Sequence, residues 1–454
     1  MIMPILGSLA IWVGLHAKAA VNEMTDVPTR SGTVIRAGQA TASSPVSSSY
    51  VPEIDALRGL AMTAVVAIHC GLFPMGWMGV WLFFVISGFA VATSLFSTKH
   101  RTAEVWSRIE TFYARRALRI WPIYFLFVAA NALVIVSLGE SGSLQEVPWL
   151  MTFTQNIKMI IESYAPGTCW PGFAHLWTLS TEQQFYVVFP LLLLLTSRRS
   201  RAIALLCVIA IAPLIRYATA RWAMAYGFDD LHIAFAVYAF GPGHFDAFAI
   251  GTLIALYREE ISQDRRLARL ATIVALMTMS VYGLAYVIIN SVLIDHFSVG
   301  VIRNIVSGVL YGQGREVWVY LVPVYASAAV LMRILAGDRH CLRICRLPGL
   351  QAIGRISYGG YLFHVPILMI LINLVPAFGR PVSGVSSYGV HILLFAAGYL
   401  MTIVAAWTSF TFLERHFSQL GRTLADERIG TLADQGQREA TLQTIIVSLR
   451  PPVE

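Results

Sequence analysis

The stretch "RGLAMTAVVAIHC", residues Arg58–Cys70, decides the class of fold. It is apolar over nearly its whole length, as expected of a helix that crosses a membrane, yet it starts with an arginine and carries a histidine near its end. His69 follows Arg58 by eleven positions, so the two side chains share one helix face about 16 Å apart along the axis. Ionisable side chains inside a membrane are costly and often mark a functional position. The stretch therefore predicts a membrane helix with a cation at one end and an imidazole near mid-membrane.

The composition of the whole chain agrees with a membrane protein. Of the 454 residues, 57% are hydrophobic and only 13% are charged, whereas soluble proteins have about 25% charged residues. Runs of about 20 apolar residues recur along the chain, each long enough to cross about 30 Å of hydrocarbon. We therefore expect an all-α integral membrane protein, a bundle of about ten transmembrane helices, over Ala56–Phe73, Trp77–Ser97, Ile120–Leu138, Leu176–Thr196, Ala202–Ile215, Phe240–Tyr257, Leu270–Asn290, Val317–Leu335, Gln351–Val375 and Val390–Phe412.

The distribution of basic residues predicts the orientation. With the N-terminus inside, 27 of the 33 Lys and Arg residues fall in segments on the cytoplasmic side and the other 6 in outer loops. Basic residues collect on the cytoplasmic side of membrane proteins, so both termini are expected there. The net charge of +8 then reflects topology, and no stripe of basic and aromatic residues indicates a nucleic-acid partner.

The chain divides into three parts by composition. Residues 1–50 are a variable segment that is either flexible, signal-like or an extra short span, residues 51–424 form the membrane domain, and residues 425–454 are a polar cytoplasmic tail. The five cysteines have no zinc-site spacing, and no His/Glu metal motif occurs, so no metal site is expected.

Two interpretations of His69 stay open from this stretch alone. It either makes a structural hydrogen bond to a neighbouring helix, or it is the proton acceptor at the end of a substrate channel whose mouth holds an anion on Arg58. The segment "FYARRALRIWPIY", which begins at Phe112, favours the second. Arg116 and Arg119 lie three apart on one helix face, and with Arg115 they form a cationic site of phosphate size, unless they merely follow the cytoplasmic bias of basic residues.

The segment "HLWTLSTEQQFY" adds an acidic residue to an apolar span. His175 and Glu182 are seven positions apart and share a helix face. Glu182 should face the bundle interior with a partner. We hypothesise that Glu182 meets His69, fixing its tautomer and raising its basicity; a purely structural Glu–His or Glu–Arg pair is the alternative.

The remaining intramembrane polar residues are weaker candidates. They are Asp246 and His244 in "GPGHFDAFAIG", His364 in "ISYGGYLFHVPIL" and Ser87 in "FFVISGFA". The Ser87–Gly88 pair is expected to allow close helix packing, with a functional hydroxyl as the alternative. Asp55 is interpreted as a helix N-cap. The candidates for substrate binding are His175, Asp246, His364 and Ser87.

Seven segments, in order, resemble the membrane acyltransferase-3 family, integral membrane O-acyltransferases of bacteria and eukaryotes that modify sugars and other hydroxyl compounds. The resemblance runs from about Glu53 to Leu424, through "EIDALRGLAMTAVVAIH", "GVWLFFVISGF", "FYARRALRIWPIY", "HLWTLSTEQQFY", "HFDAFAIGTLIA", "GRISYGGYLFHVPIL" and "FLERHFSQLGR". It implies that His69 is essential, that Arg58, Arg116 and Arg119 serve the donor, and that Glu182 occupies the family's acidic position.

The resemblance also implies the substrates and the location. The donor would be acetyl-CoA, or another acyl-CoA, on the cytoplasmic side, with no permanently bound cofactor. The acceptor would be a carbohydrate or lipid-linked glycan reached from the outer side, with membrane lipid around a multi-pass protein of the bacterial inner membrane. Many members have an aspartate at the position of Trp81, often an arginine at that of His244, and a second acidic residue at that of Gln183, so the acceptor side departs from the family pattern.

Two mechanisms and one rival class remain open. His69 acts either as general base toward the acceptor hydroxyl or as a covalent relay that carries the acyl group itself. The rival is a proton-coupled secondary transporter, which would also place His, Glu and Asp residues inside a bundle.

Overall fold

A computed structural model describes residues 51–96, 105–162, 169–293, 314–375 and 385–424, together with Ile305 and Phe378. The variable segment 1–50 and the polar tail 425–454 of the sequence analysis lie outside the described residues. Every regular element of the described part is a helix, which confirms the all-α prediction.

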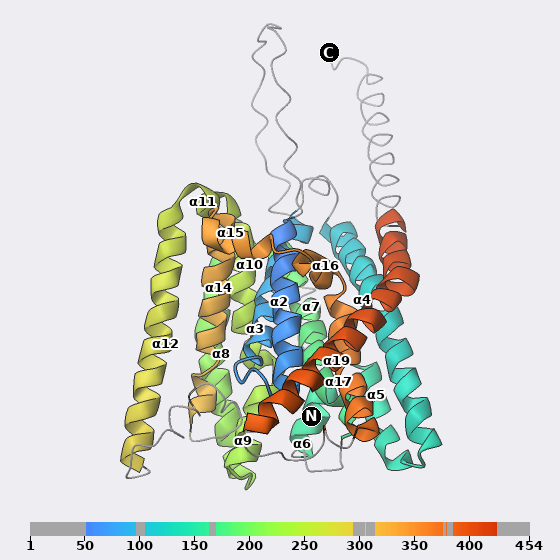
Figure 1. Cartoon of the computed structure of the whole chain (residues 1–454). Coiled ribbons are helices and arrows are strands. Elements are labelled where there is room, and N and C mark those ends of the chain that lie inside the picture. The colour runs from blue at the N-terminus through green and yellow to red at the C-terminus, as the bar shows by residue number, and fades with distance from the viewer. Residues whose placement is uncertain are drawn as a thin grey trace, which may run out of the picture.

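Long helices run side by side and form one bundle (Figure 1). They are α2 (Pro52–His69), α3 (Met78–Leu95), α4 (Val105–Ser137), α7 (Trp177–Leu194), α8 (Arg198–Ala225), α10 (Phe245–Leu256), α12 (Arg265–Leu293), α14 (Leu321–Leu335), α17 (Ser357–Leu374) and α19 (Val385–Ser409). In the view of Figure 1, α12 and α4 stand at opposite edges, α2, α3 and α7 lie between them, and α19 runs obliquely across the front.

Short helices connect the long ones. They are η2 (Ser141–Glu146), α5 (Val147–Met151), α6 (Gln155–Ile161), η3 (Pro171–Leu176), α9 (Asp230–Ala239), η4 (Gly241–His244), α11 (Arg258–Gln263), η5 (Arg315–Val317), α15 (Arg339–Cys345), α16 (Leu350–Arg355) and the π-helix η6 (Phe410–Glu414).

By length and composition, seven of the described helices are able to cross a membrane, and a bent pair formed by α9 with η4 and α10 makes an eighth. The predicted spans also include α2 and α7, which have 18 residues each and carry more polar side chains. Each of the ten predicted ranges overlaps one of these helices. The chain is therefore a multi-pass helical membrane protein.

Three local predictions from the sequence are wrong. The predicted span Ala202–Ile215 ends too early, because α8 continues through Arg216 and Arg221, two of the six basic residues that the prediction leaves in outer loops. The last-but-one span breaks at Ile356, between α16 and α17. Asp55 is not an N-cap, because α2 begins at Pro52 with Val51 as its cap residue. In the first case a charged residue suggested an end that the helix does not have, and in the second no feature of the sequence indicated the break.

Glycines allow the closest helix contacts. A Cβ on Gly88 of α3 would lie 2.0 Å from the carbonyl oxygen of Phe248 in α10, and one on Gly251 of α10 would lie 1.9 Å from that of Val85. The predicted close packing at Gly88 is thus confirmed. On α2, a Cβ at Gly59 would lie 2.4 Å from the Leu350 oxygen of α16, so α16 packs directly against the turn that carries Arg58.

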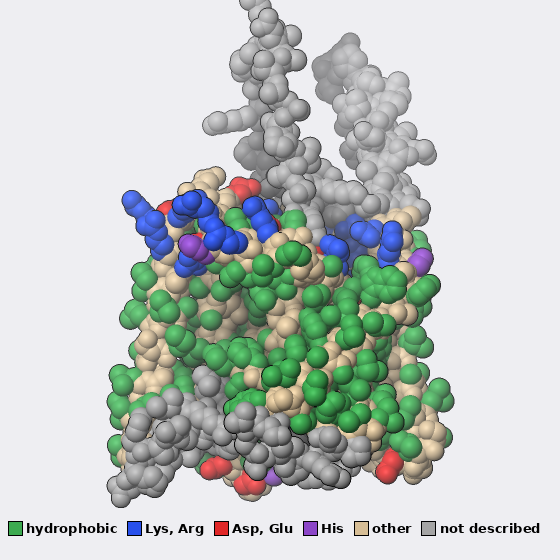
Figure 2. Space-filling model, viewed as in Figure 1, with side chains coloured by type: hydrophobic (Ala, Val, Ile, Leu, Met, Phe, Trp, Pro, Cys, Tyr) green, Lys and Arg blue, Asp and Glu red, His purple; other side chains and the backbone are tan. Residues whose placement is uncertain are grey.

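The basic side chains gather at one end of the bundle (Figure 2). It is the end at which α11, α15 and α16 lie in Figure 1. The band below it is dominated by hydrophobic side chains on the face shown. This separation is the pattern that a membrane imposes on basic residues.

Candidate active site

A cavity of about 90 Å³ lies between α2, α3, α4, α7 and α17. Most of its lining is apolar or aromatic. Its charged and small polar lining includes five residues that the sequence analysis selected from four separate segments, namely Arg58, Ser87, Arg116, Arg119 and Glu182. The fold therefore brings the predicted donor-binding arginines and the predicted acidic residue to one place.

Glu182 is held inside this cavity by two hydroxyl groups. Ser87 Oγ and the Tyr186 hydroxyl both donate to Glu182 Oε1, each at 2.5 Å. Arg116 Nη1 donates to the Tyr186 oxygen at 3.2 Å, and its guanidinium carbon lies 5.0 Å from the centre of the Tyr186 ring. Arg116 therefore reaches the carboxylate through Tyr186 rather than directly. Tyr186, one helical turn after Glu182, was not singled out from the sequence, although the spacing of four residues places both on one face.

The other two arginines differ in how they are paired. Arg58 Nη1 lies 3.2 Å from Asp55 Oδ1, in an ion pair whose side chains are 18% and 8% exposed. Arg119 is exposed toward the cavity, and among the described residues it makes no hydrogen bond or ion pair. A guanidinium that lines a cavity and makes no ion pair of its own suits an anionic ligand, because its donors are free to form paired hydrogen bonds.

Three histidines meet beside this cavity. The ring centres of His69 on α2 and His364 on α17 are 4.9 Å apart, and those of His364 and His175 on η3 are 5.1 Å apart. His364 is fully buried and His175 is 5% exposed, whereas His69 is exposed. The sequence analysis selected all three separately but did not predict that they form one cluster, since they come from distant segments.

The predicted contact between His69 and Glu182 is wrong. His69 Nδ1 lies 2.8 Å from the Val65 carbonyl oxygen, and the hydrogen bonds of Glu182 come from Ser87 and Tyr186. His175 and Glu182 do not share a face of one helix either, because His175 belongs to η3 and α7 begins only at Trp177.

Tyr361 and Thr178 connect the cavity with the histidine cluster. Both line the cavity. The Tyr361 ring lies 5.4 Å from that of His364 and 5.5 Å from that of His175, and its hydroxyl donates to the His175 carbonyl oxygen at 3.1 Å. Thr178 Oγ1 donates to the Tyr361 hydroxyl at 2.7 Å. These two residues were missed, because neither a tyrosine nor a threonine stands out in an apolar segment.

Asp246 lies in a second polar centre, away from the cavity lining. Its Oδ2 accepts from Arg216 Nη2 at 2.9 Å, its Oδ1 accepts from the Ala247 amide, and the side chains of Asp246 and Arg216 are both fully buried. Arg216 Nη1 also donates to the Gly243 carbonyl oxygen at 2.9 Å. Both carboxylate oxygens of Asp246 therefore have donors within the protein.

The same centre supports the break between α9 and α10. The two helices meet at an angle of 72° across η4, where a Gly-Pro-Gly sequence interrupts the helix. Unpaired backbone oxygens inside a membrane need donors. His244 Nε2 lies 3.0 Å from the Tyr238 oxygen, and Asn156 Nδ2 donates to the Ala239 oxygen at 3.1 Å. His244 and Arg216 therefore stabilise the broken span.

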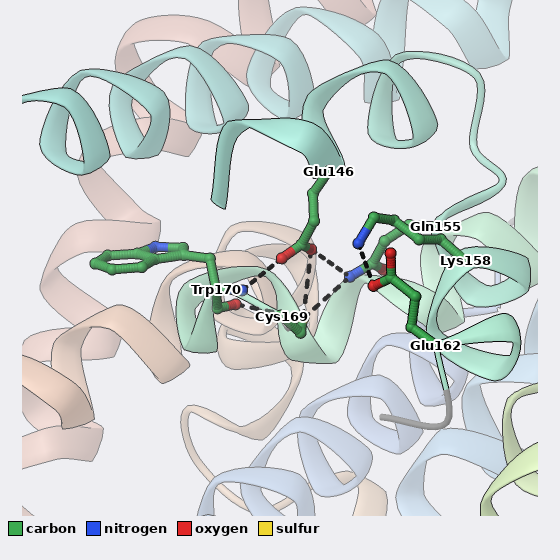
Figure 3. A network of polar contacts seen from close by, with 6 residues as sticks. All are labelled: Glu146, Gln155, Lys158, Glu162, Cys169 and Trp170. Atoms are coloured by element: carbon green, nitrogen blue, oxygen red, sulfur yellow. Dashed lines mark hydrogen bonds and ion pairs between the residues drawn. The ribbon is translucent and has the colours of Figure 1, made fainter. Parts of the chain in front are cut away.

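A third network holds η3, which carries His175, in place (Figure 3). The buried carboxylate of Glu146 accepts from the Trp170 amide and from Cys169 Sγ, the latter at 3.3 Å. Gln155 Nε2 donates to the Phe173 oxygen at 3.0 Å. Burial raises the pKa of the Glu146 carboxyl, and the Trp170 amide opposes this shift. The loop before α7 is thus fixed by side chains from η2 and α6.

Comparisons with known proteins identify the family of the chain. A family model described as an acyltransferase domain matches residues 51–413. Nodulation protein 10 of Rhizobium leguminosarum bv. viciae is 29% identical over 317 residues, which cover 65% of this chain and 73% of that protein. The O-acetyltransferase OatA of Staphylococcus aureus is 22% identical over 386 residues, which cover 83% of this chain and 58% of OatA.

No solved structure matches the chain significantly. The family model covers well over half of the sequence and includes the arginines, the glutamate and the histidines described above. The chain therefore belongs to this acyltransferase family and is an O-acyltransferase of a membrane.

Proposed function

We propose that this enzyme transfers an acyl group from acyl-CoA on the cytoplasmic side to a hydroxyl of a sugar or lipid-linked glycan on the other side of the membrane. The proposed acyl group is acetyl. The observation that carries the proposal is the convergence of Arg58, Arg116 and Arg119 on one cavity that borders the histidine cluster. The proposal includes ten spans with both termini in the cytoplasm of a bacterial cell, in line with the basic end of the bundle.

The donor end of the site suits a phosphorylated ligand. Guanidinium groups form strong paired hydrogen bonds with phosphate oxygens. Arg119 is exposed toward the cavity and makes no ion pair among the described residues, while Asp55 partly balances Arg58. In this proposal the coenzyme phosphates bind at the arginines, and the thioester arm extends past Tyr361 toward His69.

The reacting atom of His69 follows from its hydrogen bond. Because the Val65 carbonyl oxygen is only an acceptor, Nδ1 of neutral His69 carries the proton and Nε2 has the free lone pair. As general base, Nε2 takes the acceptor hydroxyl proton while the oxygen attacks the thioester carbon. The carbon–sulfur bond then breaks, and the proton passes from Nε2 to the thiolate. As covalent relay, Nε2 would instead attack the thioester and hold the acyl group until the hydroxyl takes it.

The acceptor is proposed from the relatives and from the accessible side of the site. One relative is named an O-acetyltransferase. His69 is exposed, whereas its two neighbouring imidazoles are buried, so a hydroxyl compound would reach His69 first. His175, His364 and Ser87 stay predictions as substrate contacts. The carboxylate of Asp246 is fully buried with a donor at each oxygen, which disfavours a contact with substrate.

One observation favours the transporter alternative. The broken span at η4 is a feature that many secondary transporters have at their substrate sites. Here, however, the side chains of Arg216, His244 and Asn156 occupy backbone acceptors at the break. The family match supports acyl transfer over transport.

The test replaces His69 by alanine. Purified protein in liposomes is given radiolabelled acetyl-CoA, and envelope glycans of cells with native or variant enzyme are analysed by mass spectrometry for alkali-labile esters. Removing a general base or nucleophile is expected to lower transfer by roughly 10²–10⁴-fold. His391→Ala, on α19 outside the cavity, is the matched control and should keep its activity. If the His69→Ala protein is folded and forms the same esters at the same rate, the proposal is wrong.

A further inference from the structure

His364 lies at the centre of the histidine cluster and has one ring nitrogen that the described protein leaves without a partner. The ring touches those of both His69 and His175, at 4.9 and 5.1 Å between centres. Its Nδ1 lies 2.6 Å from the Tyr361 carbonyl oxygen, whereas no described residue reaches its buried Nε2. A buried polar atom without a partner costs about 1–3 kcal/mol, and this one belongs to a ring in contact with His69.

The backbone fixes the tautomers of all three rings. A carbonyl oxygen only accepts, so the nitrogen that faces it must carry the proton. His69 and His364 are therefore protonated on Nδ1, and His175 is protonated on Nε2, which lies 3.1 Å from the Leu362 oxygen. As neutral rings, His364 and His175 keep bare nitrogens and act there only as hydrogen-bond acceptors.

We propose that His364 is a positioning residue that acts through His69. Because the Val65 oxygen already holds Nδ1–H of His69, the bare Nε2 of His364 accepts from the proton that His69 acquires on Nε2, in the interval before this proton passes to the thiolate. The inference rests on the proposed function, in which His69 Nε2 takes the acceptor proton and later gives it to the thiolate sulfur. Between these transfers His69 is an imidazolium beside the ring of His364. A neutral acceptor beside a charged donor forms one of the stronger hydrogen bonds, which stabilises that cation and raises the basicity of His69.

Among the described residues that pack around His69, no carboxylate is in a position to accept a hydrogen bond from the protonated ring. The titratable groups that surround this end of α2 are Cys70 of α2 itself, His364 and Tyr361 of α17, His175 of η3, and His391 and Tyr399 of α19. Of these, only the ring of His364 is in direct ring contact with His69. The acceptor for the protonated ring is therefore an imidazole.

Two substitutions of His364 distinguish the roles of its two ring nitrogens. In His364→Asn the side-chain amide keeps a donor near the Tyr361 oxygen but lacks an acceptor at the position of Nε2. In His364→Gln the longer side chain brings an oxygen near that position. His391→Asn, which changes an imidazole of α19 beside Gly71, is the control.

The readout is the pH dependence of kcat/KM. Losing a hydrogen bond to a charged group is expected to move the acid limb of the profile about one pH unit downward in His364→Asn. The shift should be clearly smaller in His364→Gln and absent in His391→Asn. A merely structural role of His364 would lower the rate without moving the limb. Identical acid limbs in the native enzyme and folded His364→Asn would overturn the inference.

A second measurement does not depend on turnover. Diethyl pyrocarbonate modifies the neutral form of an accessible imidazole, so the pH dependence of His69 modification, followed by mass spectrometry, reports its protonation directly. The midpoint should fall in His364→Asn by the same amount as the acid limb. If the native protein transfers no acyl group yet this midpoint shifts, the proposed function fails and the His364 contact stands. If transfer occurs and the midpoint is unchanged, only the His364 inference fails.

Discussion

Two regions of the bundle combine arginine with a carboxylate, and they use the same residue types in opposite ways. In the cavity, the carboxylate of Glu182 is held by the hydroxyls of Ser87 and Tyr186, and Arg119 is exposed with no ion pair among the described residues. In the second centre, Arg216 and Asp246 are both fully buried and lie 2.9 Å apart.

The difference shows what each region can do. A pair that is closed on itself neutralises its charges and leaves nothing for a ligand, so the Arg216–Asp246 centre serves the fold. A carboxylate that is bound by neutral hydroxyls leaves neighbouring guanidinium groups available for an external anion. In a membrane, the types of residue alone therefore do not distinguish a binding site from a structural ion pair. The two are distinguished by the partner that each charged group has.

The largest effect is expected in the buried pair. Removing one partner of a buried ion pair leaves an uncompensated charge and costs about 3–5 kcal/mol. Arg216→Ala should therefore give much less folded protein and a strongly lowered thermal midpoint in detergent, measured by fluorescence-detected size-exclusion chromatography after heating. Arg221→Ala, an exposed arginine later in α8, is the matched control. Equal midpoints for the two variants would contradict a structural role for the pair.

In the cavity, the effect should appear on donor binding and not on stability. Arg119→Ala is expected to raise the KM for acetyl-CoA by roughly 10–100-fold, the value of a hydrogen bond between charged groups. Its thermal midpoint should stay close to that of the native enzyme, because Arg119 has no ion pair to lose among the described residues. The exposed Arg266→Ala serves as the control.

A truncated donor sharpens this prediction. Acetyl-pantetheine carries the thioester but lacks the coenzyme phosphates. The native enzyme and Arg119→Ala should therefore differ much less with acetyl-pantetheine than with acetyl-CoA. An equal loss with both donors would place Arg119 near the reacting atoms and not at the phosphates.

The sequence predicted the elements and the charged lining better than the contacts. Arg58, Arg116, Arg119 and Glu182 stood out because charged residues are rare in apolar segments, and they do line one cavity. The hydroxyls of Tyr186 and Tyr361 gave no such signal, because tyrosine is common in membrane helices.

Contacts across the bundle could not be obtained from spacing within one segment. The ring that contacts His69 belongs to α17, almost 300 residues later in the sequence. The periodicity of one segment carries no information about its contacts with another segment. Arg216 was placed in a loop because a hydropathy pattern ends a span at a charge. Only the position of Asp246, 30 residues away, shows that the charge is balanced inside the bundle.

The smallest effect is expected from an ion pair outside the membrane, which sets a baseline for the two regions above. Asp338 caps α15, where its Oδ1 accepts from the amides of His340 and Cys341, and its Oδ2 lies 2.6 Å from Arg333 Nη2. The Cys341 amide, and then Arg333, lower the pKa of this carboxyl to about 2. The side chains of Arg333 and Asp338 are 37% and 23% exposed, so solvent weakens the pair.

The pH dependence of this pair has a definite sign. Because folding lowers the pKa of Asp338, the carboxylate stabilises the folded state above its unfolded pKa of about 3.9. This contribution is lost as the pH falls toward about 2. At neutral pH, Asp338→Ala is expected to cost about 1 kcal/mol through loss of the cap. Asp338→Asn keeps a capping oxygen and should cost less than about 0.5 kcal/mol. A thermal midpoint of Asp338→Asn as low as that of Arg216→Ala would remove the distinction between exposed and buried pairs on which the comparison depends.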